Sequence, residues 1–187
     1  MATINTANHT VSGIDLYFDP TVAHASLLAT TGGVTVGSPF RTSARNLGNI
    51  VTSEINPDVT YVEHFVAKNG RRHKDKVVAN IETITIPFTF DEINTANLKR
   101  FFLASALATD KLAVLQKPLQ EGSVSLLVRT EVGTSMVYSI PKAIIRPDGA
   151  LAIGDGTDWW SGPMVIEVLR YDSGQYASKP FGVIHVL

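Results

Sequence analysis

The chain has 187 residues, no cysteine and a formal net charge of −1, with 44% hydrophobic and 18% charged residues. This length suits one well-buried core, and the lack of cysteine excludes disulfides, thiolate metal sites and cysteine nucleophiles. The charge balance argues against a general nucleic-acid binder, and the low charged fraction suggests that some surface is buried against partners. With no signal-peptide pattern and no membrane-length apolar run, the sequence predicts a soluble single domain over 1–187.

The N-terminal part predicts strands separated by a long irregular stretch. Residues 13–20 alternate between apolar and polar side chains and end at a proline, which is typical of a strand. Residues 30–45 are rich in Thr, Gly and Ser, which indicates a loop or a ragged edge strand. A short strand is expected over 49–54, ended by Asn56-Pro57.

The clearest pattern is a pair of β-type runs, 61–66 and 77–90, with a charged segment between them. Asn69-Gly70 is a strong turn dipeptide, so we expect a long hairpin with a charged loop at 67–77. In the second run, alternate apolar side chains share one face, which should pack on the core: Ile84, Ile86, Phe88 and Phe90.

One helix is expected after this hairpin. Asp91 or Asn94 can cap its N-terminus, and Glu92 suits the positive end of its dipole. An i, i+3, i+4, i+7 stripe contains Leu98, Phe101, Phe102 and Ser105. We therefore expect Leu98 and the two phenylalanines to pack on a sheet.

Later segments return to strand patterns, over 124–129, 136–145, 164–171 and 181–186. About nine strands then surround one helix. The predicted fold class is mainly β, an antiparallel β-sandwich or barrel flanked by one α-helix.

Basic residues are concentrated in one short stretch of the expected hairpin. Five of the sixteen lie within nine positions: Lys68, Arg71, Arg72, Lys74 and Lys76. Asp75 is the one acid among them, so the rest of the chain holds eleven basic and sixteen acidic side chains, a net charge of −5. The pattern is a basic segment on an acidic body.

Two blocks of sequence suggest a family. Residues 56–106 hold an acidic strand, the hairpin with its basic tip, Ile-Pro-Phe-Thr-Phe and then Asp-Glu-Ile-Asn-Thr-Ala-Asn-Leu-Lys-Arg-Phe-Phe-Leu. Residues 140–156 read Ile-Pro-Lys-Ala-Ile-Ile-Arg-Pro-Asp-Gly-Ala-Leu-Ala-Ile-Gly-Asp-Gly, and Trp159-Trp160 and Val-Ile-Glu-Val-Leu follow. These blocks make up about half the chain. In the order and composition of their segments they resemble the tail tube (major tail) proteins of long-tailed, non-contractile bacteriophages.

The resemblance implies a structural virion protein with the phage tail tube fold and no enzymatic activity or cofactor. Such subunits form six-membered rings that stack into a hollow tube, through which phage DNA passes during ejection without specific binding. Implied partners are other copies of the chain, a tape measure protein and tail terminator proteins, with no membrane. Assembly in the host bacterial cytoplasm and a final place in the virion tail are also implied.

The same resemblance gives roles to charged residues. The five basic residues of 68–76 are expected to form an inter-ring contact with an acidic patch on the next ring. A basic channel wall would bind DNA and slow its passage. Four acidic residues on or beside expected strands are therefore candidates to face the lumen: Glu54, Glu63, Glu82 and Glu131.

The same sequence also fits other interpretations. The inner-tube protein of a contractile tail or secretion system shares the fold, and a carbohydrate-binding β-sandwich would use Trp159-Trp160 as an exposed stacking platform. A metal site at His64 and His73 is less favoured than exposed strand histidines, and Asp155 and Asp158 fit a turn better than a calcium loop. No acid–base pair, nucleophile elbow or dinucleotide motif stands out, so we expect no catalytic residue.

Overall fold

The computed structural model describes residues 11–28, 40–108, 110–132, 134–154 and 159–187. Within these ranges there are ten strands, one α-helix and two 3-10 turns. The strands and helix are β1 (Val11–Asp19), β2 (Ile50–Ser53), β3 (Asn56–Lys68), β4 (Arg71–Phe90), α1 (Thr95–Phe101), β5 (Ser105–Ala108), β6 (Lys111–Ala113), β7 (Gln120–Val132), β8 (Met136–Pro147), β9 (Gly162–Val168) and β10 (Val183–Val186). The 3-10 turns are Ser43–Arg45 and Gly174–Tyr176.

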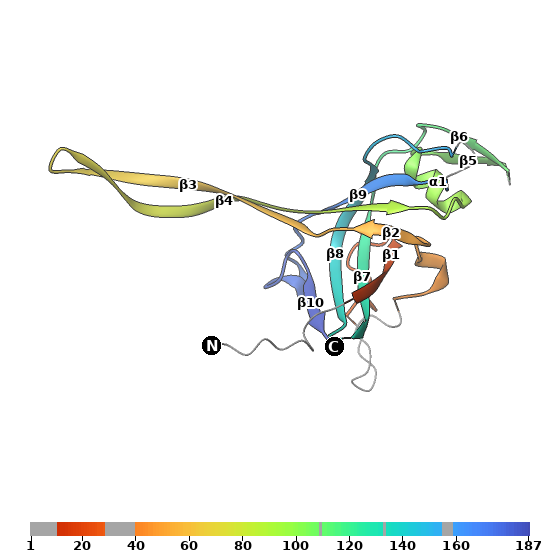
Figure 1. Ribbon diagram of the computed structural model, residues 1–187, viewed down its shortest axis with the longest axis horizontal. Helices are drawn as coiled ribbons and strands as arrows, with labels where there is room; N and C mark the ends of the chain where they lie inside the picture. The colour runs from red at the N-terminus through yellow and green to blue at the C-terminus, as the bar shows by residue number, and fades with distance from the viewer. Residues whose placement is uncertain (1–10, 29–39, 109, 133, 155–158) are drawn as a thin grey trace.

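The fold is mainly β and antiparallel with one helix, as the sequence predicted. Eight strands form one sheet in the order β1-β7-β8-β9-β4-β2, with β10 added to β8 and β3 added to β4, while β5 and β6 form a separate small hairpin. In Figure 1, α1 and the β5–β6 hairpin lie at one end of the sheet and β10 at the other.

The sheet curves around one core without closing into a barrel. Its two terminal strands, β1 and β2, form no ladder with each other in the described part of the chain. Near this opening, the Leu47 N–H donates to the Leu16 carbonyl at 2.8 Å, and Tyr17 and Asn46 form an isolated bridge. Backbone contacts of the segment before β2 therefore bring the two edges together.

The main core is built from alternating residues of the curved sheet. The expected inward face of β4 is confirmed, since Ile86, Phe88 and Phe90 are at most 3% exposed and Ile84 packs beside them. Leu16 and Phe18 of β1, and apolar residues of β7, β8 and β9, complete the same cluster. Period-two burial of this kind fixes the strand register, because a one-residue slip would turn these side chains to solvent.

Helix α1 covers one end of this core. Of the two predicted caps, Asn94 is confirmed, since its side chain accepts a hydrogen bond from the Asn97 N–H at 2.9 Å. Phe101 is buried and meets the Phe102 ring edge-on at 5.2 Å, whereas Leu98 is half-buried. The helix ends before Ser105, because Leu103 takes a φ of 46° and the chain turns away into β5.

A second, smaller cluster lies apart from the main core. Its buried members are Tyr17, Leu27, Phe40 and Tyr176. They come from β1, from the segments on either side of residues 29–39 and from the second 3-10 turn. This cluster fixes the loops that follow β1 and precede β10.

Candidate assembly surface

Strands β3 and β4 extend away from the body as a long two-stranded ribbon (Figure 1). We call residues 58–83 the arm, and all of them except Val59 are exposed. Among the described residues, β3 pairs only with β4, and β9 pairs with β4 no further out than Ile84. Both edges of the arm therefore carry unpaired backbone groups, which are a template for strand addition.

The arm ends in a tight turn. Asn69 and Gly70 form it with φ of 53° and 74°, which confirms the predicted turn dipeptide. The charged loop predicted at 67–77 is wrong, however, because Ala67 pairs with Arg72 and Lys68 pairs with Arg71. A two-residue turn with two positive φ values matches the strand twist, so the ladder continues up to it despite the run of charge.

Large apolar side chains lie on both faces of the arm. The register gives the two faces, since cross-strand partners share a face and neighbours along a strand alternate. One face carries Tyr61, Phe65 and Val77, and the other carries Val62, Val66, Val78 and Ile81, all between 40% and 59% exposed. A lone two-stranded ribbon is marginally stable, and a contiguous apolar patch marks an interaction site.

Charges change sign along the arm. In its middle, Lys74 forms an ion pair with Glu63, and the His64 Nδ1 lies 2.6 Å from Asp75 Oδ1. At its outer end, the cations are Lys68, Arg71 and Arg72, and the Arg72 guanidinium lies 5.4 Å from the Phe65 ring centroid. At its inner end, the carboxylates are Asp58 and Glu82, with Glu54 just before β3.

These end charges have no ion-pair partner of opposite sign among the described residues, and neither has Lys76 in mid-arm, whereas Lys74 and Glu63 neutralise each other within the ribbon. We call Lys68, Arg71 and Arg72 the tip, and Glu54, Asp58 and Glu82 the root. A subunit therefore presents unpaired charges of opposite sign at the two ends of one element.

The structure separates the residues that the sequence grouped together. Of the five basic residues expected at the inter-ring contact, Lys68, Arg71 and Arg72 lie at the tip, while Lys74 is paired with Glu63 and Lys76 lies opposite His64. Of the lumen candidates, Glu54 and Glu82 lie at the root and Glu63 in mid-arm. The Glu131 side chain lies outside what the structure describes.

The structure bears differently on the metal site, the tryptophan platform and the calcium loop that the sequence suggested as alternatives. Among the described residues, no three His, Asp or Glu side chains are grouped to hold a metal ion. Trp159 and Trp160 are 88% and 44% exposed, so Trp159 does not pack in the core of the subunit. Asp155 and Asp158 lie outside the described residues. No helix in the described part of the chain is long and apolar enough to span a membrane.

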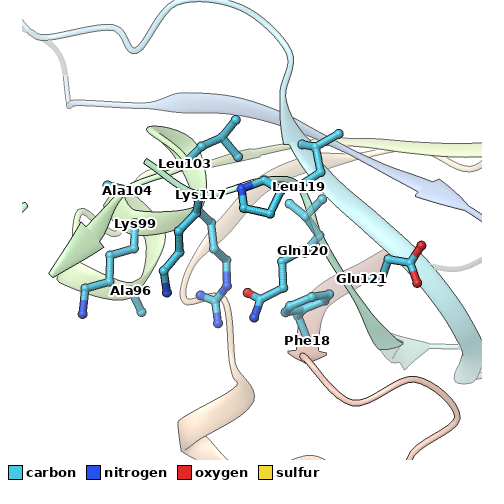
Figure 2. Close-up of a pocket in the computed structure, with 12 residues that line it drawn as sticks. Phe18, Ala96, Lys99, Leu103, Ala104, Lys117, Leu119, Gln120 and Glu121 are labelled. Carbon is cyan, nitrogen blue, oxygen red and sulfur yellow. The ribbon is translucent and has the colours of Figure 1, made fainter. Parts of the chain in front are cut away.

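A pocket of about 440 Å³ lies beside α1 and was not evident from the sequence (Figure 2). Its walls are largely apolar: Phe18, Ala96, Leu103, Ala104, Pro118, Leu119 and Ile145. Lys99, Arg100 and Lys117 add three cations, and the side chains of Lys99 and Lys117 point to the same side of the pocket. Its one carboxylate, Glu121, is paired with Lys142 at 3.1 Å.

Arg100 is the most constrained of these cations. Burial lowers the pKa of its guanidinium. The group lies 5.6 Å from the Phe18 ring centroid and donates to Asn97 Oδ1 at 3.3 Å, with no ion-pair partner among the described residues. The pocket therefore suits an apolar segment that carries an acidic side chain, and it repels a basic one.

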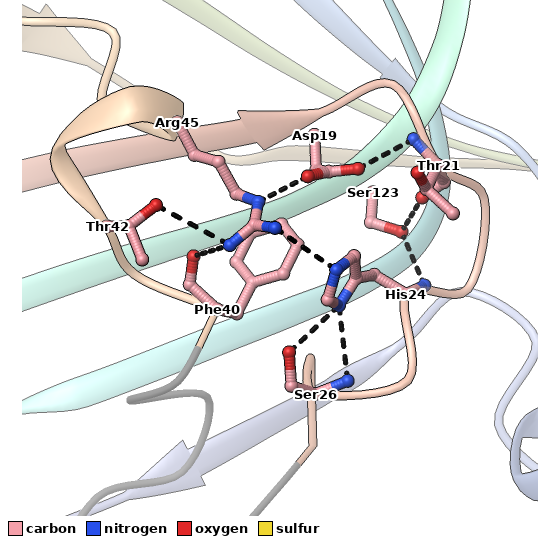
Figure 3. Close-up of polar contacts among 8 residues, drawn as sticks. All are labelled: Asp19, Thr21, His24, Ser26, Phe40, Thr42, Arg45 and Ser123. Carbon is pink, nitrogen blue, oxygen red and sulfur yellow. Dashed lines mark hydrogen bonds and ion pairs between the residues drawn. The ribbon is translucent and has the colours of Figure 1, made fainter.

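A polar network joins the loops around the smaller cluster (Figure 3). Arg45 forms an ion pair with Asp19, donates to the Phe40 carbonyl at 3.1 Å and lies 5.2 Å from the Phe40 ring centroid. The Ser123 hydroxyl donates to the Thr21 carbonyl at 2.6 Å and accepts from the His24 N–H at 3.1 Å. These bonds link β1 and β7 to the neighbouring loops, so the network holds β1 and the loops in place.

Replacing Asp19 with Asn should lower the stability of the body in a pH-dependent way. Burial raises the pKa of Asp19, but hydrogen bonds from Arg45 and Thr21 outweigh it and hold the pKa below the ordinary value of 3.8. The carboxylate therefore stabilises the fold above the unfolded pKa, and this contribution is lost as the pH falls through the folded value. At pH 7 we expect a loss of about 2 kcal/mol, which is typical of a hydrogen bond to a charged group.

Thermal unfolding of Asp19→Asn across pH 3 to 7 measures this effect. The difference from the unmodified protein should be largest at neutral pH and shrink at the acidic end. Asp172→Asn is the matched control, because Asp172 pairs with Arg170 on the exposed surface and such pairs contribute little. A difference that is the same at every pH would contradict the assigned role of the Asp19 carboxylate.

Residues 30–139 match a family model described as "Protein of unknown function UCP028589". The match covers more than half of the chain and includes the whole arm. A comparison with curated proteins found no match. The chain belongs to the family of unknown function UCP028589.

Proposed function

We propose that this chain is the tail tube protein of a long-tailed bacteriophage, a structural subunit that polymerises through its arm. Copies would form stacked hexameric rings around a channel for phage DNA, and the chain would catalyse no reaction. The observation that carries the proposal is the arm itself, exposed along its length and apolar on both faces. The tube architecture and the ring number come from the resemblance of residues 56–106 and 140–156.

Open strand edges give the physical basis for polymerisation. In the part of the chain that the structure describes, the outer edge of β3 and the edge of β4 over 71–83 have no neighbouring strand. Strand addition from other copies would satisfy these backbone groups and cover the apolar faces. A contact between unlike surfaces propagates from copy to copy, and it yields a ring where it closes and a filament where it does not.

The charge distribution supports a channel through which DNA slides. Outside residues 68–76 the chain has a net charge of −5. An acidic wall does not bind DNA by counterion release, so it would not retain the genome. Within this proposal, tape measure and tail terminator proteins set the length of the tube and cap it, and the assembled chain resides in the virion.

Electron microscopy of the purified protein tests the proposal. Negative-stain images at increasing protein concentration should show long hollow tubes of even width. Compact single molecules at every concentration would contradict it. An inner-tube protein of a contractile tail or secretion system would also give tubes, and binding of a sheath protein distinguishes that alternative.

Exposure of the tryptophans favours a second candidate function, a carbohydrate-binding module. Trp159 and Trp160 are the only tryptophans in the chain, so intrinsic tryptophan fluorescence reports on this site alone. A saturable fluorescence change with oligosaccharides would support sugar stacking on the rings. If the tryptophans lie at a subunit seam, the emission should instead shift to shorter wavelength on assembly and stay unchanged with sugars.

A further inference from the structure

We propose that the basic tip of one copy's arm binds the acidic root of another copy's arm. This inference rests on the proposed function only in taking the arm as an assembly element. It adds the location of the acidic surface that receives the arm, which neither the resemblance nor the family match gives. The charges, the apolar faces and a hollow at the root support it.

The first support is the sign of the unpaired charges on each face. Glu82 at the root and Arg72 near the tip share one face of the arm. Asp58 at the root shares the other face with Lys68 and Arg71 at the tip. Each face therefore carries a carboxylate at its inner end and a cation at its outer end. A tip placed on a root pairs opposite charges whichever face is used.

A second support is the hollow beside the root. A cavity of about 540 Å³ lies where β4 leaves the body, lined on the arm side by Ala79, Ile81 and Glu82 and on the body side by Val168, Leu169 and Phe181. Its other charged residues are engaged, since Glu167 lies 3.6 Å from Arg146 and Arg170 lies 3.0 Å from Asp172. Glu82 thus gives the hollow an unpaired negative charge.

The tip has the matching composition. Phe65 and Val66 lie directly behind the tip cations and are exposed. Phe65 shares its face with Arg72, so it can enter the hollow while Arg72 meets Glu82, and apolar burial and charge pairing then occur together. The pocket beside α1 does not fit the tip, because its Lys99, Arg100 and Lys117 repel a basic segment.

Cross-linking between engineered cysteines tests this pairing, because the chain has no cysteine of its own. Ala67→Cys marks the tip and Thr83→Cys marks the root, and both positions are exposed and leave every charge in place. In one copy about ten residues of extended strand separate the two positions, and at the rise per residue of a β-strand this places them roughly 30 Å apart. A short bis-maleimide therefore joins tip to root only between copies.

We expect the double variant to give covalent products larger than a monomer, whereas neither single variant does. The yield should fall several-fold between about 0.1 M and about 1 M salt, because the Debye length shortens from about 10 Å to about 3 Å. Products formed by Ala67→Cys alone would mean tip-to-tip contact and overturn the inference, as would a double variant that stays monomeric.

The size of the products tests the proposed function separately. Tip-to-root contact that propagates gives a ladder of increasing mass. Contact that closes between two copies gives dimers only, which supports the tip-to-root pairing but contradicts a tube. Tubes seen by microscopy without tip-to-root cross-links would support the proposed function and overturn this inference.

Discussion

Replacing residues 62–78 with the dipeptide Asn-Gly is expected to give a folded protein that forms no tubes. Tyr61 and Ala79 are cross-strand partners, so a two-residue turn joins them without changing the register of the root. All the deleted residues are exposed, and none belongs to the main core. The thermal midpoint of the body should change little, while sedimentation velocity shows monomers at concentrations where the intact chain polymerises.

The shortened variant also allows a second experiment, in which it is mixed with the intact chain. It keeps Glu54, Asp58 and Glu82, so it still offers a root, but it has no tip. Added in small amounts to the intact chain, it should shorten the assemblies, because each copy that joins accepts an arm and extends none. Tubes of normal length formed by the shortened variant alone would refute the assignment of the arm as the assembly element.

Reversing the tip charges with Arg71→Glu/Arg72→Glu should abolish assembly of a subunit that remains folded. The tip then carries the same sign as the root, and like charges placed together at an interface cost several kcal/mol. Both residues are exposed, and Arg71 has no partner of opposite charge among the described residues, so the subunit itself loses little. Negative-stain images and circular dichroism measure the two effects.

The matched control is Lys111→Glu/Lys179→Glu, which makes the same change in net charge outside residues 58–83. This control should assemble normally. Adding Asp58→Lys/Glu82→Lys to the tip-reversed chain should restore assembly, because the opposite signs are re-created with the ends exchanged. Equal loss of assembly in the tip variant and the control would indicate a general charge effect and contradict tip binding.

The sequence predicted those parts of the fold that depend on local pattern. Alternation from Ile84 to Phe90 identified the core face of β4, because a half-buried strand has a side-chain period of two. Asn69-Gly70 gave the turn and Asn94 gave the helix cap, since each requires a particular residue type at one place. These local requirements do not depend on how distant segments pack.

Other parts depend on distant contacts and were not predictable. The β-type runs at 61–66 and 77–83 indicate strands, but alternation does not reveal that the body leaves both faces uncovered. The pocket beside α1 combines Phe18, Arg100, Lys117 and Ile145, which only the fold brings together. Asn97 is buried because its amide donates to the Leu47 carbonyl at 2.7 Å, fifty residues away.

The most direct test of the account is hydrogen exchange of the arm amides as a function of protein concentration. In separate subunits, outward-facing amides on both edges of 58–83 should exchange rapidly, since they have no strand partner among the described residues. If other copies cover the arm, these amides should become protected as concentration rises, while protection of β7 and β8 stays constant. Arm amides that exchange at the same rate at every concentration would contradict the account.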